Sequence, residues 1–264
     1  YLKDGDEEDR IRQINAKMSE YIDGGLFEVH KDMAVLVDRA TDHAASRKGL
    51  VVALDLEKYD YSEGSQTLIR ATEGTIVDRL PPRIKVRQDA PLELPHIMVL
   101  IDDPKMQVIE PLFEKERGLL YDTDLMLGGG HVKGYALSDA ADLEGVADGL
   151  RKLVDPALFA DKYGVEEGVS PLLFAMGDGN HSFATAKAIW EEKKKTGASL
   201  DDPARYALVE LVNIHDEGLV FEPIHRVLFG VESKAIFDCF KDGHEVELLV
   251  CADEDEMFLM MGKK

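Results

Sequence analysis

The chain has 264 residues, 45% of them hydrophobic, and this length and composition allow one large core or two modest ones. Its formal charge of −21, from 52 acidic against 31 basic residues, disfavours direct binding to DNA or to anionic membrane surfaces. No apolar run reaches the roughly 18 residues that a membrane-spanning helix needs, and the N-terminal DGDEEDR does not fit a signal peptide, so we expect a cytoplasmic protein.

The two ends of the sequence lead us to expect a fragment. The first residue is Tyr1 rather than Met, and the final stretch, EMFLMMGKK, stops directly after apolar residues that need a partner. Residues 1–95 are expected to form a helix and a β-rich portion, truncated at its start. Residues 96–264 are expected to form a strand-helix portion, truncated at its end and continuous with the first as one domain.

In the first portion, apolar residues at helical spacing predict an amphipathic helix from Asp6 to the Gly24-Gly25 stop. The segments LFEVHKD, MAVLVDR and GLVVALDLEKY then predict strands, with neighbouring strands antiparallel. Residues 60–95 are polar and contain four prolines, which predicts a long loop.

In the second portion, HIMVLI predicts a buried strand, and the following helix is expected to take Asp103 as N-cap and Pro104 as first residue. Two strands, LLYDTDLML and HVKGYAL, are predicted on either side of GGG. SDAADLEGVADGLRKLVDP predicts a helix that Pro156 ends, YALVELVNI and GLVFEPIHRVLF predict strands, and KAIFDCF a short helix. The fold class expected is α+β (mixed α/β), a mixed sheet with flanking helices.

One loop carries the main functional signal. In PLLFAMGDGNHSFATAKAIW, residues 171–190, the apolar LLFAM predicts a central strand and the spacing of the apolar residues after Ser182 predicts a helix. GDGNHS therefore lies at the start of a helix, where backbone N–H groups without partners and the positive end of the helix dipole favour an anion. Gly177 and Gly179 allow phosphate oxygens to approach the backbone, and Lys187, one turn into the helix, is expected to reach the same anion.

The loop does not match well-known phosphate motifs. It lacks the spacing of GxxxxGK[ST], and Ser182 stands at the third glycine of GxGxxG, which disfavours a Walker loop and a dinucleotide fold. In a simpler interpretation, Asp178 or Asn180 only caps the helix, His181 is an ordinary surface histidine and Lys187 only pairs with an acid one turn on. The pattern leaves both interpretations open.

The strand-DGNHS-helix block resembles the ADGHHR signature of a domain-of-unknown-function family, number 1015, once labelled SpoOJ/ParA/ParB/RepB-like. RKGLVVALDLEKYDY, IRATEGTI, PHIMVLIDD and GLVFEPIHRVL also resemble this family, so the resemblance covers most of residues 26–229. It implies a ParB/sulfiredoxin-like core, in a superfamily that binds nucleotide phosphates and includes an ADP-dependent kinase of free serine. A phosphotransferase that uses ADP or ATP on a small hydroxyl substrate such as free serine is the function it implies.

The chain departs from that pattern at two positions of the loop. Asn180 stands where sulfiredoxin-like loops carry a cysteine nucleophile and where the family signature carries a histidine, so cysteine chemistry is excluded there. Ser182 replaces the arginine, which is the better bidentate phosphate ligand. We therefore expect Arg70, of IRATEGTI, and the pair His225-Arg226, of EPIHRV, to bind phosphate together with Asn180 and Ser182. An ordinary surface or structural role for each of these cations remains open.

For phosphoryl transfer, three residues are expected to be catalytic. Asp178 and Glu73 are the two candidates to take the proton of the acceptor hydroxyl. If Asp178, the nearer to the expected phosphate, instead holds Mg²⁺ through water, Glu73 is the base. His181 would donate to a phosphoryl oxygen and stabilise the charge that develops there.

Two other functions remain open at this stage. The first is a non-catalytic, ParB-like module that binds a nucleotide or a partner. The second is a transition-metal site of Asp178, His181, His215 and His225, whose spacing matches no fixed ligand motif. GGGH, at residues 128–131, predicts either a second ligand loop or simply a hairpin turn.

Overall fold

The computed structural model describes residues 6–94, 97–166, 168–220, 228–240 and 252. The chain forms two compact units, Tyr1–Val220 and Phe221–Lys264. In the second unit the structure describes α6 (Ser233–Phe240), which confirms the short helix predicted from KAIFDCF. The first unit contains the sheet and the candidate site.

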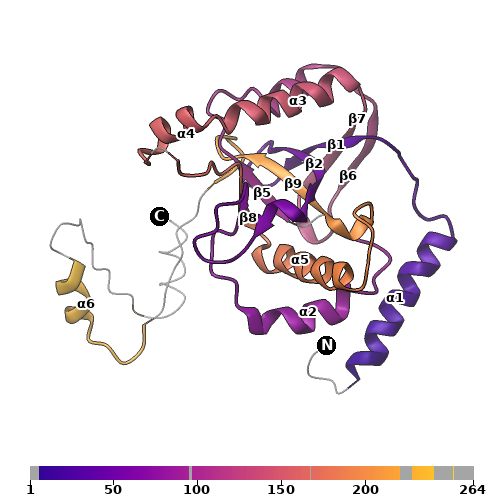
Figure 1. Ribbon diagram of the computed structural model, residues 1–264, viewed down its shortest axis with the longest axis horizontal. Helices are drawn as coiled ribbons and strands as arrows, with labels where there is room; N and C mark the ends of the chain where they lie inside the picture. The colour runs from indigo at the N-terminus through magenta and orange to yellow at the C-terminus, as the bar shows by residue number, and fades with distance from the viewer. Residues whose placement is uncertain (1–5, 95–96, 167, 221–227, 241–251, 253–264) are drawn as a thin grey trace. The chain divides into compact units, whose positions relative to one another are not determined.

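A mixed sheet of nine strands forms the centre of the first unit (Figure 1). In chain order the strands are β1 Ala34–Ala40, β2 Lys48–Asp55, β3 Tyr59–Asp60, β4 Ile69–Arg70, β5 Met98–Ile101, β6 Leu119–Asp124, β7 His131–Leu137, β8 Phe174–Asp178 and β9 Tyr206–Asn213. Their order in the sheet is β3-β4-β8-β5-β9-β2-β1-β7-β6. The pairs β3–β4, β4–β8 and β5–β9 are parallel and the others antiparallel.

Helices lie on both sides of this sheet (Figure 1), which confirms the α+β fold class. On one side are α3 (Ala140–Leu153) and α4 (Pro156–Tyr163), and on the other are α2 (Leu80–Arg87) and α5 (Asn180–Lys195). The predicted first helix is α1 (Glu7–Asp23). Of the helices that the structure describes, none combines the length and the apolar content needed to cross a bilayer.

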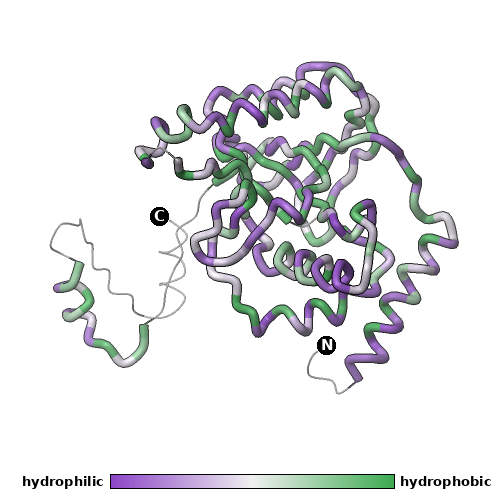
Figure 2. Tube along the Cα trace, viewed as in Figure 1, coloured by the Kyte–Doolittle hydropathy of each residue, from purple (hydrophilic) through white to green (hydrophobic). Residues whose placement is uncertain are grey.

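The core between the sheet and α5 fixes the position of the loop before that helix. Phe183 and Trp190 are wholly buried, and the ring of Tyr59 meets Phe183 edge-on with centroids 4.5 Å apart. Figure 2 shows hydrophobic residues concentrated along the central strands, while the outer sides of the helices are largely hydrophilic. Burial of such large side chains contributes about 1.5–3 kcal/mol each, so α5 is firmly held against the sheet.

Two segments differ from their predictions in the first portion of the chain. Residues 26–32 (LFEVHKD) form no strand, and Asp32 has a φ of 54°, which interrupts extended backbone directly before β1. Residues 60–95 are not one long loop, because they contain β4 and α2. The prolines at 81 and 82 begin α2, where a missing amide hydrogen costs nothing.

The helix predicted after Asp103 is also wrong. That segment forms only a short 3₁₀ helix, Glu110–Glu114, because Met106, in the first turn of the predicted helix, has a φ of 50°, outside the helical region. The Asp103 carboxylate still binds the backbone that follows it, since Oδ2 accepts from the amide of Val108 at 2.9 Å. Pro156 follows the end of α3 and is also the first residue of α4. The strand, loop and helix of residues 171–190 are confirmed, as is the hairpin around GGG.

Candidate functional site

The loop singled out in the sequence joins β8 to α5 through Gly179. Gly179 has a φ of 91°, and a Cβ there would lie 3.3 Å from the Cα of Ile97, so this turn requires glycine. No side chain caps α5, and Asp178 Oδ1 instead accepts from the amide of Gly179 at 2.7 Å. The positive end of the α5 dipole therefore has no capping side chain.

Two other loop residues have clear packing roles. A Cβ at Gly177 would come within 2.9 Å of Leu100 Cγ, so glycine allows β8 and β5 to approach. The carbonyl of Ser182 accepts from Arg87 Nη1 at 2.9 Å, which joins α5 to the end of α2. These contacts hold the loop in place independently of any ligand.

Asn180 connects the loop to the segment around Thr72. Its side chain, in a residue only 6% exposed, accepts from the amide of Thr72 at 3.1 Å and donates to Thr72 Oγ1 at 3.2 Å. Thr72 Oγ1 in turn donates to the carbonyl of Met176 at 2.6 Å. The side-chain amide of Asn180 is therefore engaged within the protein, and its contribution is to position the loop.

His181 and Glu73, two of the three predicted catalytic residues, lie together. His181 Nδ1 is 3.6 Å from Glu73 Oε1, and His181 Nε2 accepts from the amide of Ile76 at 3.3 Å. Because Nε2 accepts, the proton of the neutral ring is on Nδ1, on the side of Glu73. The histidine side chain is only 14% exposed and the carboxylate is 61% exposed, so Glu73 is the member of the pair open to solvent.

A cleft of about 740 Å³ lies beside this pair, between the segments 60–65 and 70–77. Its lining is part polar and part apolar, and the polar residues include Ser62, Ser65, Thr72 and Glu73. Since Thr72 contacts Asn180 and Glu73 contacts His181, one wall of the cleft adjoins the start of α5.

Arg70 is the cationic residue in the wall of this cleft. Its Nε donates to the carbonyl of Thr67 at 2.8 Å and its Nη2 donates to the carbonyls of Ser170 and Pro171 at 2.7 and 3.3 Å. Burial lowers the pKa of Arg70, although a guanidinium remains charged at neutral pH. Within the described part of the chain it has no carboxylate partner and Nη1 has no acceptor, so a positive charge and two donor hydrogens remain for a ligand.

The ammonium of Lys187 is directed to other partners. It donates to the carbonyl of Leu56 at 2.9 Å and pairs with Glu191 Oε1 at 2.8 Å. The pKa of Asp60, in the cleft lining, is lowered first by the amide of Ser62 and also by the charge of Lys187. Lys187 therefore acts on the cleft through its field, while its hydrogen bonds stabilise α5.

The predicted phosphate ligands His225 and Arg226 lie outside the described residues. His215, from the transition-metal alternative, pairs with Asp102 at 2.8 Å beyond the end of β5, whereas Asp178 pairs with Met98 at the start of that strand. Among the described residues no group of three or more His, Cys, Asp and Glu is placed to hold a metal ion.

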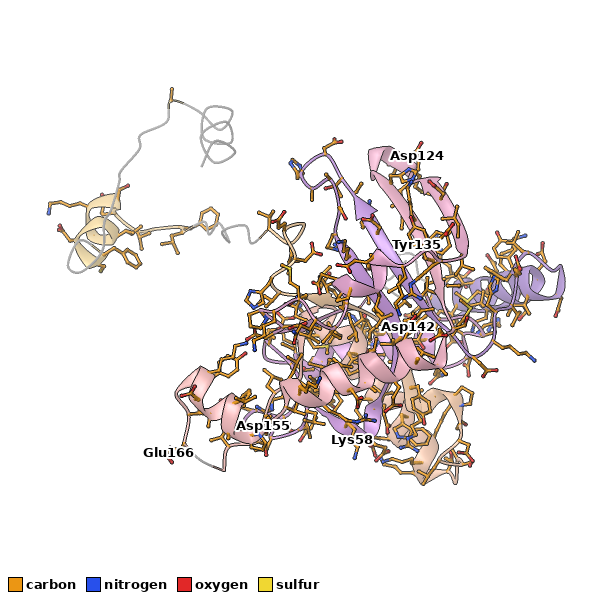
Figure 3. The ribbon with its side chains drawn as sticks, turned by 90° about the horizontal axis from the view of Figure 1, so that it is seen from above. Lys58, Asp124, Tyr135, Asp142, Asp155 and Glu166 are labelled. Atoms are coloured by element: carbon orange, nitrogen blue, oxygen red, sulfur yellow. The ribbon has the colours of Figure 1, made fainter. Side chains whose placement is uncertain are left out.

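The GGGH segment forms the turn of the β6–β7 hairpin, and Figure 3 shows Asp124 at the tip of this hairpin. His131 lies between Asp124, 2.6 Å from Nδ1, and Asp122, 2.5 Å from Nε2, and these hydrogen bonds, that of Asp124 first, raise its pKa. A Cβ at Gly130 would lie 2.1 Å from the carbonyl oxygen of Ala40. The close approach of Ala40 therefore explains the glycine at this position, and the two aspartates of the hairpin occupy both ring nitrogens of His131.

Sequence reasoning missed Thr72, which joins the cleft to the loop. A signal was present, since Thr72 lies in the same short segment as Arg70 and Glu73, between two other candidates. It also missed the contacts around Asp102, although HIMVLIDD and YALVELVNIH both place a polar residue shortly after an apolar strand.

Comparison with known families gives a match over the full length of the sequence. The model of a family described as protein of unknown function (DUF1015) matches residues 1–264. No curated protein and no solved structure matches the chain. The match covers the whole sequence, including the GDGNHS loop and the segment that carries Arg70 and Glu73. The chain therefore belongs to the DUF1015 family of proteins of unknown function.

Proposed function

We propose that the cleft beside α5 binds the phosphates of ADP or ATP and that the protein transfers a phosphoryl group to a small hydroxyl compound such as free serine. The observation that carries this proposal is the guanidinium of Arg70, which forms no ion pair with any described residue and lies in the wall of a cleft that adjoins the start of α5. In a chain of charge −21, a local cation and an uncapped helix start are the features that would attract a phosphate. The ParB/sulfiredoxin-like core remains part of this proposal.

Glu73 is assigned as the general base. The oxygen of the acceptor attacks phosphorus as its proton passes to the Glu73 carboxylate, and the bond from phosphorus to the leaving phosphate oxygen breaks. His181 is held by the amide of Ile76, and its single N–H, on Nδ1 and 3.6 Å from Glu73 Oε1, would donate to a phosphoryl oxygen bound beside Glu73.

A magnesium ion would fit beside Asp178. Asp178 is exposed, and one carboxylate oxygen is used by the amide of Gly179, so the other is available. Mg²⁺ in phosphoryl transfer usually takes one or two carboxylates and completes its shell with water and substrate phosphate. When bound, the ion would neutralise phosphate charge.

Calorimetric titration with ADP and with ATP, each with Mg²⁺, tests the binding step. Arg70→Gln should weaken binding about tenfold or more, because hydrogen bonds to charged groups contribute about 1.5–3 kcal/mol. His181→Ala should also lose affinity. Arg83→Gln removes an exposed arginine of α2 and should bind as wild type does. Equal affinity in Arg70→Gln, His181→Ala and wild type would refute the proposal.

A binding module without turnover is the second candidate. It is favoured by the engagement of Asn180 with Thr72 and of Lys187 with Leu56 and Glu191, which leaves few loop groups free for chemistry. Incubation with ATP or ADP and serine, followed by ³¹P NMR, separates the two. Phosphoserine supports the transferase, and nucleotide binding without any product over a panel of small alcohols supports the module.

A further inference from the structure

A second cleft, of about 430 Å³, lies at the opposite end of β5 from the site described above. The loop at Asp178 adjoins Met98, the first residue of β5, whereas the second cleft includes Asp102, directly after Ile101, the last. Its lining comes from the segment after β5, the end of α3, α4 and the segment before β8. In Figure 3 the labels Asp155 and Glu166 mark the two ends of the α4 region, well away from the hairpin tip at Asp124.

Apolar side chains form much of this second cleft. They are Leu153, Leu158, Phe159, Leu172 and Leu173. A volume of this size falls within the range of about 300–1,000 Å³ that is typical of small-molecule sites, which are mainly apolar with a few polar groups. The cleft is therefore suited to an apolar body of modest size.

The acidic residue Asp102, at one side of this cleft, is already neutralised by its neighbours. It pairs with Lys162 at 2.7 Å and His215 at 2.8 Å, and it accepts from the hydroxyl of Tyr163. Burial raises the pKa of Asp102, but the hydrogen bonds from Lys162, Tyr163 and His215 outweigh burial and leave the pKa below its ordinary value. Asp102 is therefore ionised and compensated, and it offers little repulsion to an anion.

Two lysines in the lining have no such partner. Neither Lys105 nor Lys152 forms an ion pair with any residue that the structure describes, in a chain with 52 acidic residues. Asp103, also in the lining, is 2% exposed, and its carboxylate caps the backbone amides that follow it. Asp161 is the remaining acid of the lining, so the two lysines balance two aspartates, of which Asp103 is buried and turned to the backbone.

We propose that this second cleft binds a small apolar carboxylate. Its hydrocarbon body would lie against the leucines and Phe159, and its carboxylate would be held by Lys105 and Lys152. The lining is formally neutral, with three lysines against the aspartates at 102, 103 and 161, so it suits a monoanion better than a phosphate of higher charge. This site does not depend on the proposed nucleotide site, and His181→Ala should bind the carboxylate as wild type does.

Equilibrium dialysis with radiolabelled octanoate tests the site on the full chain. We expect one octanoate per chain and about tenfold weaker binding in the double variant Lys105→Gln/Lys152→Gln, since both ion pairs to the carboxylate are lost and each is a modest, solvent-exposed interaction. Lys31→Gln removes an exposed lysine that lies outside this cleft and should not change binding. Acetate, which has the charge but no hydrocarbon body, should compete poorly.

The apolar wall is tested by Leu158→Asn. Leu158 is 65% exposed, so this change should leave thermal unfolding close to that of wild type while weakening octanoate binding several-fold. Three results would each overturn the proposal. They are no detectable binding at millimolar octanoate, the same affinity in the double lysine variant as in wild type, and competition by acetate as strong as that by unlabelled octanoate.

Discussion

Thr72 and Asn180, which lie 108 residues apart in the chain, hold each other through two hydrogen bonds. The backbone amide of Thr72 donates to the side chain of Asn180, and the same side chain donates back to the threonine hydroxyl. This reciprocal contact fixes the wall of the cleft against the first turn of α5. Both the stability of the loop and the geometry of the candidate site therefore depend on it.

Asn180→Ala should lower the free energy of unfolding by about 1–3 kcal/mol, because it removes two hydrogen bonds, each worth about 0.5–1.5 kcal/mol, from a buried side chain. Urea denaturation measures this change. Thr72→Ser keeps the hydroxyl and should stay close to wild type, whereas Thr72→Val removes it and should be destabilised in the same direction as Asn180→Ala. Equal stability of Thr72→Val and Thr72→Ser would show that the contact contributes little.

Gly179→Ala should destabilise the protein by about 1–3 kcal/mol, because the residue has a φ of 91° and a Cβ would meet Ile97. Gly145 is the matched control: it lies inside α3, and a Cβ there has no atom within 4 Å. Gly145→Ala should therefore stabilise the protein by about 0.5–1 kcal/mol. Thermal and urea unfolding of the two variants should shift in opposite directions, and a shift of the same sign would contradict this assignment.

The pair Asp55–Arg205 should make stability depend on pH. Arg205 Nε and Nη2 donate to the two oxygens of Asp55 at 2.9 and 2.6 Å, and chiefly through this contact they lower the pKa of Asp55. Because the folded pKa lies below the ordinary value of about 3.9, the stabilisation is complete above that value and is lost as the pH falls through the folded pKa.

Asp55→Asn should therefore unfold more easily than wild type at pH 7, by about 1–3 kcal/mol, and the difference should shrink at pH 3. Urea unfolding at the two pH values measures this. Arg205→Gln and the double variant complete a mutant cycle, in which the double variant should cost less than the sum of the single ones. A difference that stays constant between pH 7 and pH 3 would exclude this explanation.

Glu73→Gln tests the proposed base. Its side chain is 61% exposed, so folding should not change, whereas the rate of phosphoryl transfer should fall by about 10²–10⁴ with little change in nucleotide affinity. Glu166→Gln, which changes an exposed carboxylate just after α4, is the control and should keep the wild-type rate. An unchanged rate in Glu73→Gln would remove this residue from the mechanism.

Much of the fold is predictable because local patterns and final structure agree there. The helical spacing after Asp6 corresponds to α1, and the glycines of GGGH correspond to the β6–β7 turn. Where predictions failed, the reason lies in particular backbone positions. Prolines at 81 and 82 lie in the first turn of a helix instead of preventing it. Asp32 interrupts the strand predicted from LFEVHKD, and Met106, with a φ of 50°, interrupts the helix for which Asp103 supplies a cap.

For the candidate site, the chain order was enough to place the GDGNHS loop between a strand and a helix. It did not determine the partners of the loop. Glu73 and His181 meet, but Lys187 is held by Leu56 and Glu191, and Arg70 donates to carbonyls around residue 170. These outcomes depend on which distant segments lie side by side in the sheet.

By itself, the sequence determined the type and order of most elements, because periodicity, capping residues and turn residues act over a few neighbouring positions. Only the tertiary structure decided that β4 lies beside β8, and hence that the segment of Thr72 and Glu73 adjoins α5. Only the tertiary structure decided also that Asp102 and His215 meet at the end of the parallel pair β5 and β9. Strand pairing over a hundred residues results from burial of the whole core, and no local pattern encodes it.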